Sequence, residues 1–121
     1  MAIRSFQELV VWQKAMDLVE EVYHSTRHFP PDELYGLTSQ LRRAVVSIPS
    51  NIAEGQGRDS TKEFLHHLSI AHGSLCEVQT QILIAQRLTY LSPPHTERLI
   101  ELCVEVAKLT NGLCNSLNKR L

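Results

Sequence analysis

The spacing of apolar residues predicts four helices along the chain. The first is predicted from about Ser5 to Arg27, with Ser5 and Glu8 spaced as a capping box at its start. Pro30 and Pro31 end it, because proline cannot continue a helical hydrogen-bond ladder. Its expected inward face steps by three and four residues through Leu9, Trp12, Met16, Val19 and Tyr23.

The second predicted helix begins at Pro31 or Asp32, continues to Glu54 and stops at the glycines that follow. Pro49 lies inside it, and we expect a kink there because the proline ring clashes with the carbonyl of Val45 and cannot donate to it. The apolar face of this helix is formed by Leu34, Leu37, Leu41, Ala44, Ile48 and Ile52.

The third predicted helix begins at Ser60, which forms a second capping box with Glu63. Its apolar residues alternate steps of four and three, through Phe64, Leu68, Ala71, Leu75, Val78, Ile82 and Ala85. Ser92 and Pro93 begin the fourth helix, since proline is favoured at the first helical position. The inward face of the fourth helix is expected to contain Leu99, Leu102, Val106, Leu109, Leu113 and Leu117.

No segment shows the alternation of a strand, so we expect an all-α fold. Short connections between long helices favour antiparallel neighbours, which predicts an up-down-up-down four-helix bundle formed by a single domain over residues 1–121. Surplus apolar residues favour association between subunits, although a broad buried stripe is the alternative. The surplus residues are Leu65, Ile70, Leu83, Ile84, Ile100, Cys103, Val104, Ala107 and Cys114.

The second predicted helix also carries a polar stripe on one face, formed by Gln40, Arg43, Ser47, Asn51 and Glu54. Several of these side chains make directional hydrogen bonds. The stripe therefore fits an ordered network at a subunit junction, and it also fits ordinary solvent. We favour the junction, because a solvent-facing helix surface usually carries more lysine and glutamate.

Twelve basic and thirteen acidic residues give a formal charge of −1, so bulk charge does not draw this chain to nucleic acid or to a membrane. Any such binding requires a local patch. The candidate basic patches are Arg42, Arg43, Arg58 and Lys62, and nearer the C-terminus Lys108, Lys119 and Arg120. The alternative is that these residues form ion pairs on helix surfaces.

Two Glu-x-x-His pairs, Glu21 with His24 and Glu63 with His66, have the spacing that di-metal four-helix bundles use to bind iron. The helical phase places both pairs on outward faces, so we expect no metal site and no cofactor. The sequence also contains no nucleophile motif and no phosphate-binding loop, which predicts a protein that is not an enzyme.

The three cysteines are odd in number and form no Cys-x-x-Cys motif, as expected for reduced thiols. No signal peptide is recognisable, and no apolar run reaches the roughly 18 residues of a transmembrane helix. We therefore expect a cytoplasmic protein without a membrane partner.

Short motifs typical of one family occur along nearly the whole chain, and Ser47-Ile-Pro-Ser-Asn-Ile-Ala-Glu-Gly55 is the most specific. The others are Phe6-Gln-Glu-Leu9 with Trp12, Phe29-Pro30, Tyr35-Gly-Leu37, Gln40-Leu-Arg-Arg-Ala44, Glu63-Phe64, Ala71-His-Gly-Ser74, Thr80-Gln81 and Leu88-Thr-Tyr-Leu91. In these motifs the chain resembles the four-helix-bundle proteins encoded in intervening sequences of bacterial 23S rRNA genes.

The resemblance implies a homopentameric ring. It also implies kinship with the accessory protein of diversity-generating retroelements, a strongly basic protein that binds nucleic acid and a reverse transcriptase. The resemblance identifies no catalytic residue. It implies that five motif residues determine the fold and the assembly, namely Arg43, Ser47, Pro49, Asn51 and Glu54.

The leading hypothesis is a non-enzymatic oligomeric scaffold that binds nucleic acid or a protein partner such as a reverse transcriptase. One alternative is a metal-dependent enzyme that uses the Glu-x-x-His pairs. The other is a structural or passenger protein without a role in its host.

Overall fold

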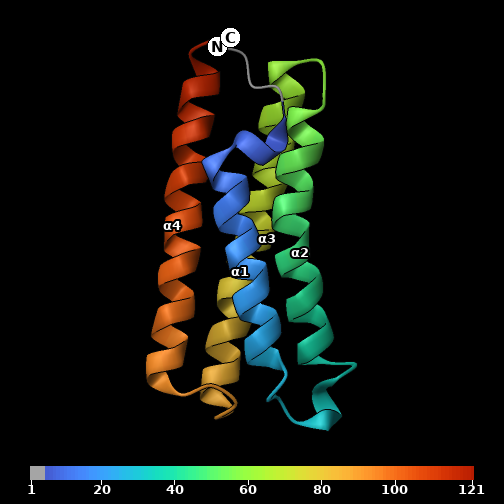
Figure 1. Ribbon diagram of the computed structural model, residues 1–121, viewed down its shortest axis with the longest axis vertical. Coiled ribbons are helices and arrows are strands. Elements are labelled where there is room, and N and C mark those ends of the chain that lie inside the picture. The colour runs from blue at the N-terminus through green and yellow to red at the C-terminus, as the bar shows by residue number, and fades with distance from the viewer. Residues whose placement is uncertain (1–4) are drawn as a thin grey trace.

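The computed structural model describes residues 5–121, which form four long helices and no strand. The helices are α1 (Val10–Thr26), α2 (Leu37–Gln56), α3 (Thr61–Arg87) and α4 (Pro93–Asn118), and short 3-10 helices at Phe6–Glu8 and Pro31–Glu33 precede α1 and α2. Figure 1 shows the four helices side by side, with the α1–α2 and α3–α4 connections at one end and the α2–α3 connection at the other. The prediction of an all-α fold is confirmed.

Two of the predicted helix starts are confirmed by their caps. Ser60 Oγ accepts a hydrogen bond from the Glu63 amide (3.1 Å), and Ser92 Oγ accepts one from the His95 amide (3.3 Å). The predicted start at Ser5 is wrong for α1, because Ser5 caps the 3-10 helix through the Gln7 amide (3.2 Å). The first four residues, which enter the prediction of no signal peptide, lie outside the described part of the chain.

The start of α2 also differs from the prediction. Pro31–Glu33 form a separate 3-10 helix, and α2 begins only after Gly36, whose backbone (φ −114°, ψ −115°) is not helical. Glu33 stabilises this start, since its carboxylate accepts hydrogen bonds from the Leu37 amide (3.1 Å) and the Tyr90 hydroxyl (2.8 Å). These two bonds hold the pKa of the Glu33 carboxyl below its usual value. Leu34, expected in the core, is 49 % exposed.

One hydrophobic core runs between the four helices. All seven residues of the predicted α3 face are buried, as are the four of α2 from Leu41 onwards. On α4, Leu99, Val106 and Leu117 are buried as predicted. Cys103 and Thr110 are buried as well, whereas the other predicted leucines, Leu102, Leu109 and Leu113, are half-buried.

The predicted inward face of the first helix is confirmed at Leu9, which is buried, and in part at Trp12 and Val19, which are half-buried against the core. Along α1 the most buried face is rotated from the predicted one about the helix axis. The fully buried face consists of Val11, Ala15, Leu18 and Val22. Met16 and Tyr23, expected inside, are each 37 % exposed. Because α1 packs against both α2 and α4, its inward direction lies between those neighbours. Its sequence carries two adjacent apolar stripes, and periodicity alone does not choose between them.

The approach between α2 and α3 is close at the end where the two helices connect. Gly55 is buried there, and a Cβ at this position would lie 2.7 Å from His67 Cβ and 3.0 Å from Phe64 Cδ1. α2 runs through the buried Pro49, beside which the Ser50 hydroxyl donates to the Val46 carbonyl (2.8 Å). The expected kink stays a prediction. Within residues 5–121, no helix has the length and apolarity needed to cross a membrane.

Candidate functional site

α2 presents two chemically different sides, and the side that faces α3 is polar. Ser47 Oγ lies 2.9 Å from Ser74 Oγ of α3. Asn51 Nδ2 donates to the carbonyl (2.9 Å) and the hydroxyl (3.0 Å) of Ser47. Asn51 Oδ1 also lies 3.1 Å from Nδ1 of His67 on α3. The middle of the predicted polar stripe is therefore a hydrogen-bond network inside the chain.

The ends of the same stripe are exposed. Glu54 pairs with Arg58 one helical turn later (2.8 Å), while Gln40 and Arg43 have no side-chain partner among residues 5–121 and lie on the surface. Gln40 and Arg43 border an open hollow of about 370 Å³ between α2 and α3, which Ser74 and Glu77 line from the α3 side. The assembly role of Gln40, Arg43, Ser47, Pro49, Asn51 and Glu54 stays a prediction.

The side of α2 that faces α1 is mainly apolar and open to the surface. Met16 of α1 and Val46 of α2 are 37 % and 39 % exposed. They line an open hollow of about 360 Å³, together with Trp12, Val19, Pro49, Ser50 and Ala53.

Val46 joins this hollow to a larger one of about 630 Å³ nearer the α1–α2 connection. Tyr35 at its edge is 93 % exposed. Arg42 lies with its guanidinium 4.8 Å from the centre of the Tyr23 ring, and its Nε donates to Thr26 Oγ1 (2.8 Å). We call the two joined hollows the α1–α2 groove. The larger part is lined by Tyr23, Leu34, Tyr35, Thr38, Ser39, Arg42, Arg43, Val46 and Ser47.

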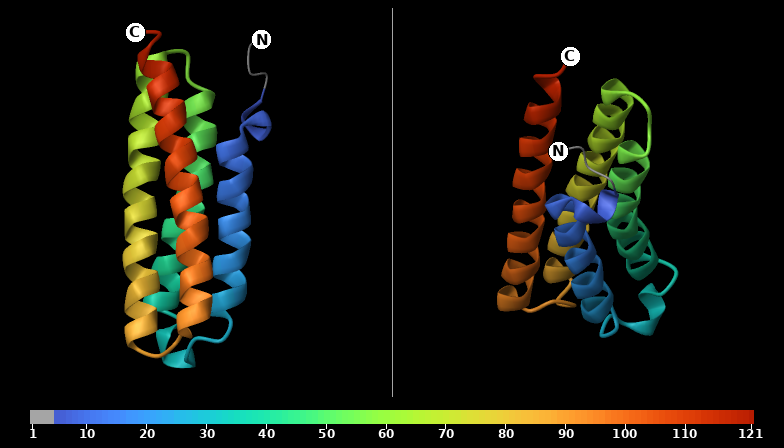
Figure 2. Two further views of the ribbon diagram at one scale, coloured as in Figure 1. Left: turned by 90° about the vertical axis from the view of Figure 1, so that its left-hand side faces the viewer. Right: turned by 45° about the horizontal axis from the view of Figure 1, so that its top comes forward.

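The structure does not bring the four predicted basic residues together. Arg42 and Arg43 lie near the start of α2, whereas Arg58 and Lys62 follow its end. The sixteen positions between Arg42 and Arg58 correspond to about 24 Å along a helix. Arg58 and Lys62 instead share one end of the molecule with the C-terminus of α4, as Figure 2 shows, where the basic residues are Lys119 and Arg120. Lys108 lies further along α4, away from this end.

In the two Glu-x-x-His pairs, each glutamate has a partner of its own at the surface. Glu21 forms an ion pair with Arg98 of α4 (3.1 Å), and Glu63 accepts a hydrogen bond from the Ser60 hydroxyl (3.3 Å). His24 and His66 are exposed, in agreement with the outward phase expected for both pairs. No three potential metal ligands of residues 5–121 are grouped closely enough to hold an ion.

A serine–histidine contact joins α1 to α4, with Ser25 Oγ 2.7 Å from Nε2 of His95. The Ser25 hydroxyl donates to the Glu21 carbonyl (2.8 Å) and is buried. This one hydroxyl thus has both the Glu21 carbonyl and the His95 imidazole as hydrogen-bond partners. The contact holds the ends of two helices together.

The three thiols differ in exposure: Cys103 is buried, Cys114 is half-buried and Cys76 is exposed. Burial raises the pKa of the Cys103 thiol to about 12 and also raises the pKa of Cys114. Because the thiolate is the reactive form, these two are poor nucleophiles. Cys76 lies on the surface with its Sγ 3.8 Å from Nε2 of His72.

Sequence reasoning missed the aromatic part of the α1–α2 groove. The apolar spacing predicts Tyr23 on an inward face, and it places Tyr35 on no predicted face, whereas both side chains are exposed. The available signal was the Gly36 that follows Tyr35, since a break before α2 leaves Leu34 and Tyr35 outside the helical stripe.

Comparison with known proteins identifies the fold and the family. The crystal structure of a protein of unknown function from Bacteroides thetaiotaomicron, described as an S23 ribosomal protein family member, superposes with a TM-score of 0.81. It is 20 % identical, and the match covers 88 % of this chain and 96 % of that one, so it shows a shared fold. No curated protein matches the sequence. The family model of the 23S rRNA-intervening sequence protein matches residues 7–112, and the chain therefore belongs to that family.

Proposed function

We propose that this protein is a non-enzymatic scaffold that self-associates and presents one basic end of each subunit to nucleic acid. In this proposal the chain is an antiparallel up-down-up-down bundle, and the assembly is a homopentameric ring. The observation that carries the proposal is the α1–α2 groove, an apolar surface that the described chain leaves uncovered.

Exposed apolar side chains occur singly on most proteins, but a continuous apolar surface marks a site of interaction. Along the groove, Met16, Leu34, Tyr35 and Val46 are all more than one third exposed. A second set of exposed apolar residues lies on α3 and α4, formed by Ile70, Leu83, Ile84 and Val104. Exposed apolar residues outside the groove offer further surface for contacts with other copies.

Assembly offers a reason why a chain with a charge of −1 can bind a polyanion. Cyclic symmetry gives every subunit the same orientation relative to the ring axis, so equivalent ends share one rim. The end that holds Lys62, Lys119 and Arg120 would then be repeated around that rim. These three residues form no ion pair within residues 5–121, whereas Arg58 at the same end is paired with Glu54, and Asp59 and Glu63 are its neighbours in the sequence. Several weak contacts made at once bind much more tightly than one contact alone.

The test measures the molar mass by light scattering and the binding of fluorescent single-stranded RNA and duplex DNA by anisotropy over a salt series. We expect an oligomer whose binding weakens steeply with salt, because phosphate contacts release counterions. The double variant Lys62→Glu/Lys119→Glu should weaken binding by tenfold or more without changing the mass. Arg87→Glu is the matched control, since this exposed arginine ends α3 at the opposite end of the molecule.

A monomer at micromolar concentration would contradict the assembly. An oligomer that binds neither nucleic acid at low salt would contradict the nucleic-acid role and point to a protein partner.

A further inference from the structure

We infer that the α1–α2 groove is the socket for α4 of a second copy of this chain. The docking surface on α4, called here the α4 ridge, consists of Glu97, Ile100, Glu101 and Val104. The inference rests on the self-association proposed above and assigns the two surfaces that make the contact.

The groove is apolar with a cationic rim. Val46 and Leu34 supply exposed aliphatic surface, and Tyr35 stands almost free of the chain at 93 % exposure. Arg42 and Arg43 line the same hollow, and neither has a carboxylate partner among residues 5–121. A ligand for this groove should therefore combine aliphatic side chains with unpaired carboxylates.

The α4 ridge has that chemistry. Val104 is 40 % exposed and Ile100 is half-buried beside it. Glu97 and Glu101 border this pair and form no ion pair within the described chain, whereas the neighbouring Glu105 is paired with Lys14 (3.3 Å). The ridge thus offers two aliphatic side chains and two free carboxylates within two helical turns, and the one cation on the same face, Lys108, lies a turn beyond Val104. The part from Glu97 to Val104 therefore matches the groove in both apolar surface and charge.

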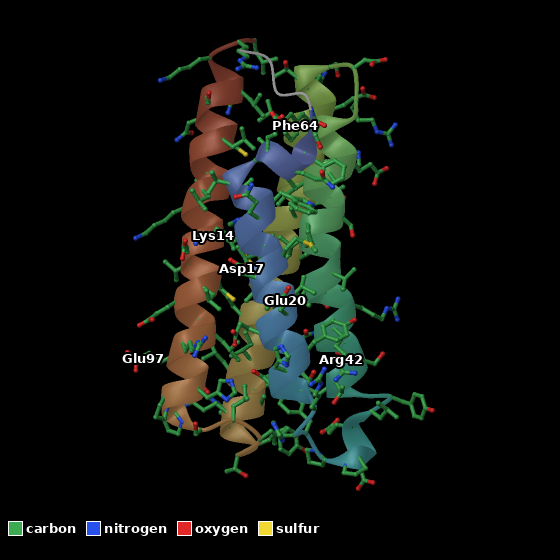
Figure 3. All side chains as sticks on the ribbon, in the orientation of Figure 1. Lys14, Asp17, Glu20, Arg42, Phe64 and Glu97 are labelled. Carbon is green, nitrogen blue, oxygen red and sulfur yellow. The ribbon has the colours of Figure 1, made fainter. Side chains whose placement is uncertain are left out.

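The positions of the two surfaces suit neighbours that stand parallel. In Figure 3, Arg42 and Glu97 lie on opposite sides of the molecule and at similar heights along the helices. Copies placed side by side in the same orientation would bring the arginines of one against the glutamates of the next. Because the groove and the ridge are different surfaces, the contact is heterologous, and a pair of copies keeps one free groove on one copy and one free ridge on the other. Such a contact closes into a ring when the rotation between copies permits it.

The test is a charge reversal on each surface, with assembly followed by analytical ultracentrifugation over a concentration series. Arg43→Glu should raise the concentration needed for assembly by about tenfold or more, because it places like charges against Glu97 and Glu101. Glu97→Arg/Glu101→Arg should do the same from the other side. The triple variant that carries all three changes should recover assembly, since the charges are exchanged rather than removed. Lys62→Glu, on neither surface, should leave it unchanged.

The recovery in the triple variant is the decisive result, because a merely misfolded variant would not regain assembly. If the wild type assembles and neither reversal affects it, the groove and the ridge are not the contact, and the proposed scaffold stands on another interface. If Arg43→Glu abolishes nucleic-acid binding while the mass stays constant, nucleic acid occupies the groove and the inference is wrong. A wild type that stays monomeric would overturn both proposals.

Discussion

The two sides of α2 use polar and apolar residues in opposite ways. Towards α3, Ser47 and Asn51 form hydrogen bonds to each other and to Ser74 and His67 inside the chain. Towards α1, Val46 and its apolar neighbours line an open groove instead of a closed seam. A polar stripe is thus used within the subunit, while an apolar surface is left for the outside.

This difference shows that the polarity of a residue does not by itself tell whether the residue faces solvent. A buried or half-buried polar group is stable when its hydrogen bonds are made, and α3 supplies the partners on one side. An exposed apolar group costs little in a monomer, but it becomes a source of affinity when a partner covers it. Four substitutions test this contrast between the two sides of α2.

The largest effect is expected where α2 and α3 approach most closely. Gly55→Ala would place a methyl group 2.7 Å from His67 Cβ and 3.0 Å from Phe64 Cδ1, so one of the helices must shift. We expect a loss of about 1–3 kcal/mol in the free energy of unfolding, measured by urea denaturation.

Gly73→Ala is the matched control, because no atom lies within 4 Å of its added methyl group and the residue is in the interior of α3. Alanine there should stabilise the protein by about 0.5–1 kcal/mol. Equal effects at both positions would mean that the two helices are not in close contact at Gly55.

The next effect concerns the polar network between α2 and α3. Asn51→Ala removes the bonds to Ser47 and leaves the facing nitrogen of His67 without its partner. We expect a loss of about 1–2 kcal/mol in the free energy of unfolding. Asn115→Ala, at an exposed position of α4, should change it by less than about 0.5 kcal/mol. No difference between the two variants would show that the network contributes nothing to stability.

A smaller change of opposite sign is expected at Gln81 of α3. This side chain is 5 % exposed, and its Oε1 has no hydrogen-bond partner among the described residues. Gln81→Met keeps the shape and removes the unpaired acceptor, and it also removes the 3.3 Å bond from Gln81 Nε2 to the exposed carboxylate of Glu77, which water can replace. The free energy of unfolding should therefore rise by about 1 kcal/mol or less. A decrease, measured by the same urea titration, would show that the acceptor is bonded in solution.

The smallest effect on the isolated subunit is expected on the open side of α2. Met16→Gln should change the free energy of unfolding by less than about 0.5 kcal/mol at dilutions where the chain is monomeric. At higher concentration the melting temperature of the wild type should rise with concentration, because assembly stabilises the folded state, and that of the variant should rise less. Parallel curves for both proteins would place Met16 outside any interface.

The success of the sequence-based prediction varied from helix to helix for a physical reason. α3 carries one unbroken stripe of alternating four- and three-residue steps, so all seven residues predicted for its inward face are buried, and only Gln81 beside them was missed. α1 has two apolar stripes side by side, and only contact with α2 and α4 shows that Leu18 points inward and Met16 outward. The 3-10 helix before α2 was missed because Pro31–Glu33 also satisfies the start signals of an α-helix.

The candidate site was predictable only as a list of residue types. Two pairs of basic residues, Arg42 with Arg43 and Arg58 with Lys62, are near each other in the sequence. In the folded chain, about 24 Å of helix separates the two pairs. The groove beside Arg42 depends on Tyr23 and Tyr35, which come from α1 and from the connection before α2. These side chains come together only when the helices pack against one another.

The sequence by itself determined the class of the fold, the caps at Ser60 and Ser92, the inward face of α3 and the membership of a family. These properties follow from local spacing and short motifs, which act within one or two helical turns. The rotation of α1, the internal use of Ser47 and Asn51, and the uncovered groove with its arginines were decided by the tertiary structure. Each of them depends on which neighbour a helix face meets, because a side chain's burial and partners are properties of the packed assembly of helices and not of one helix alone.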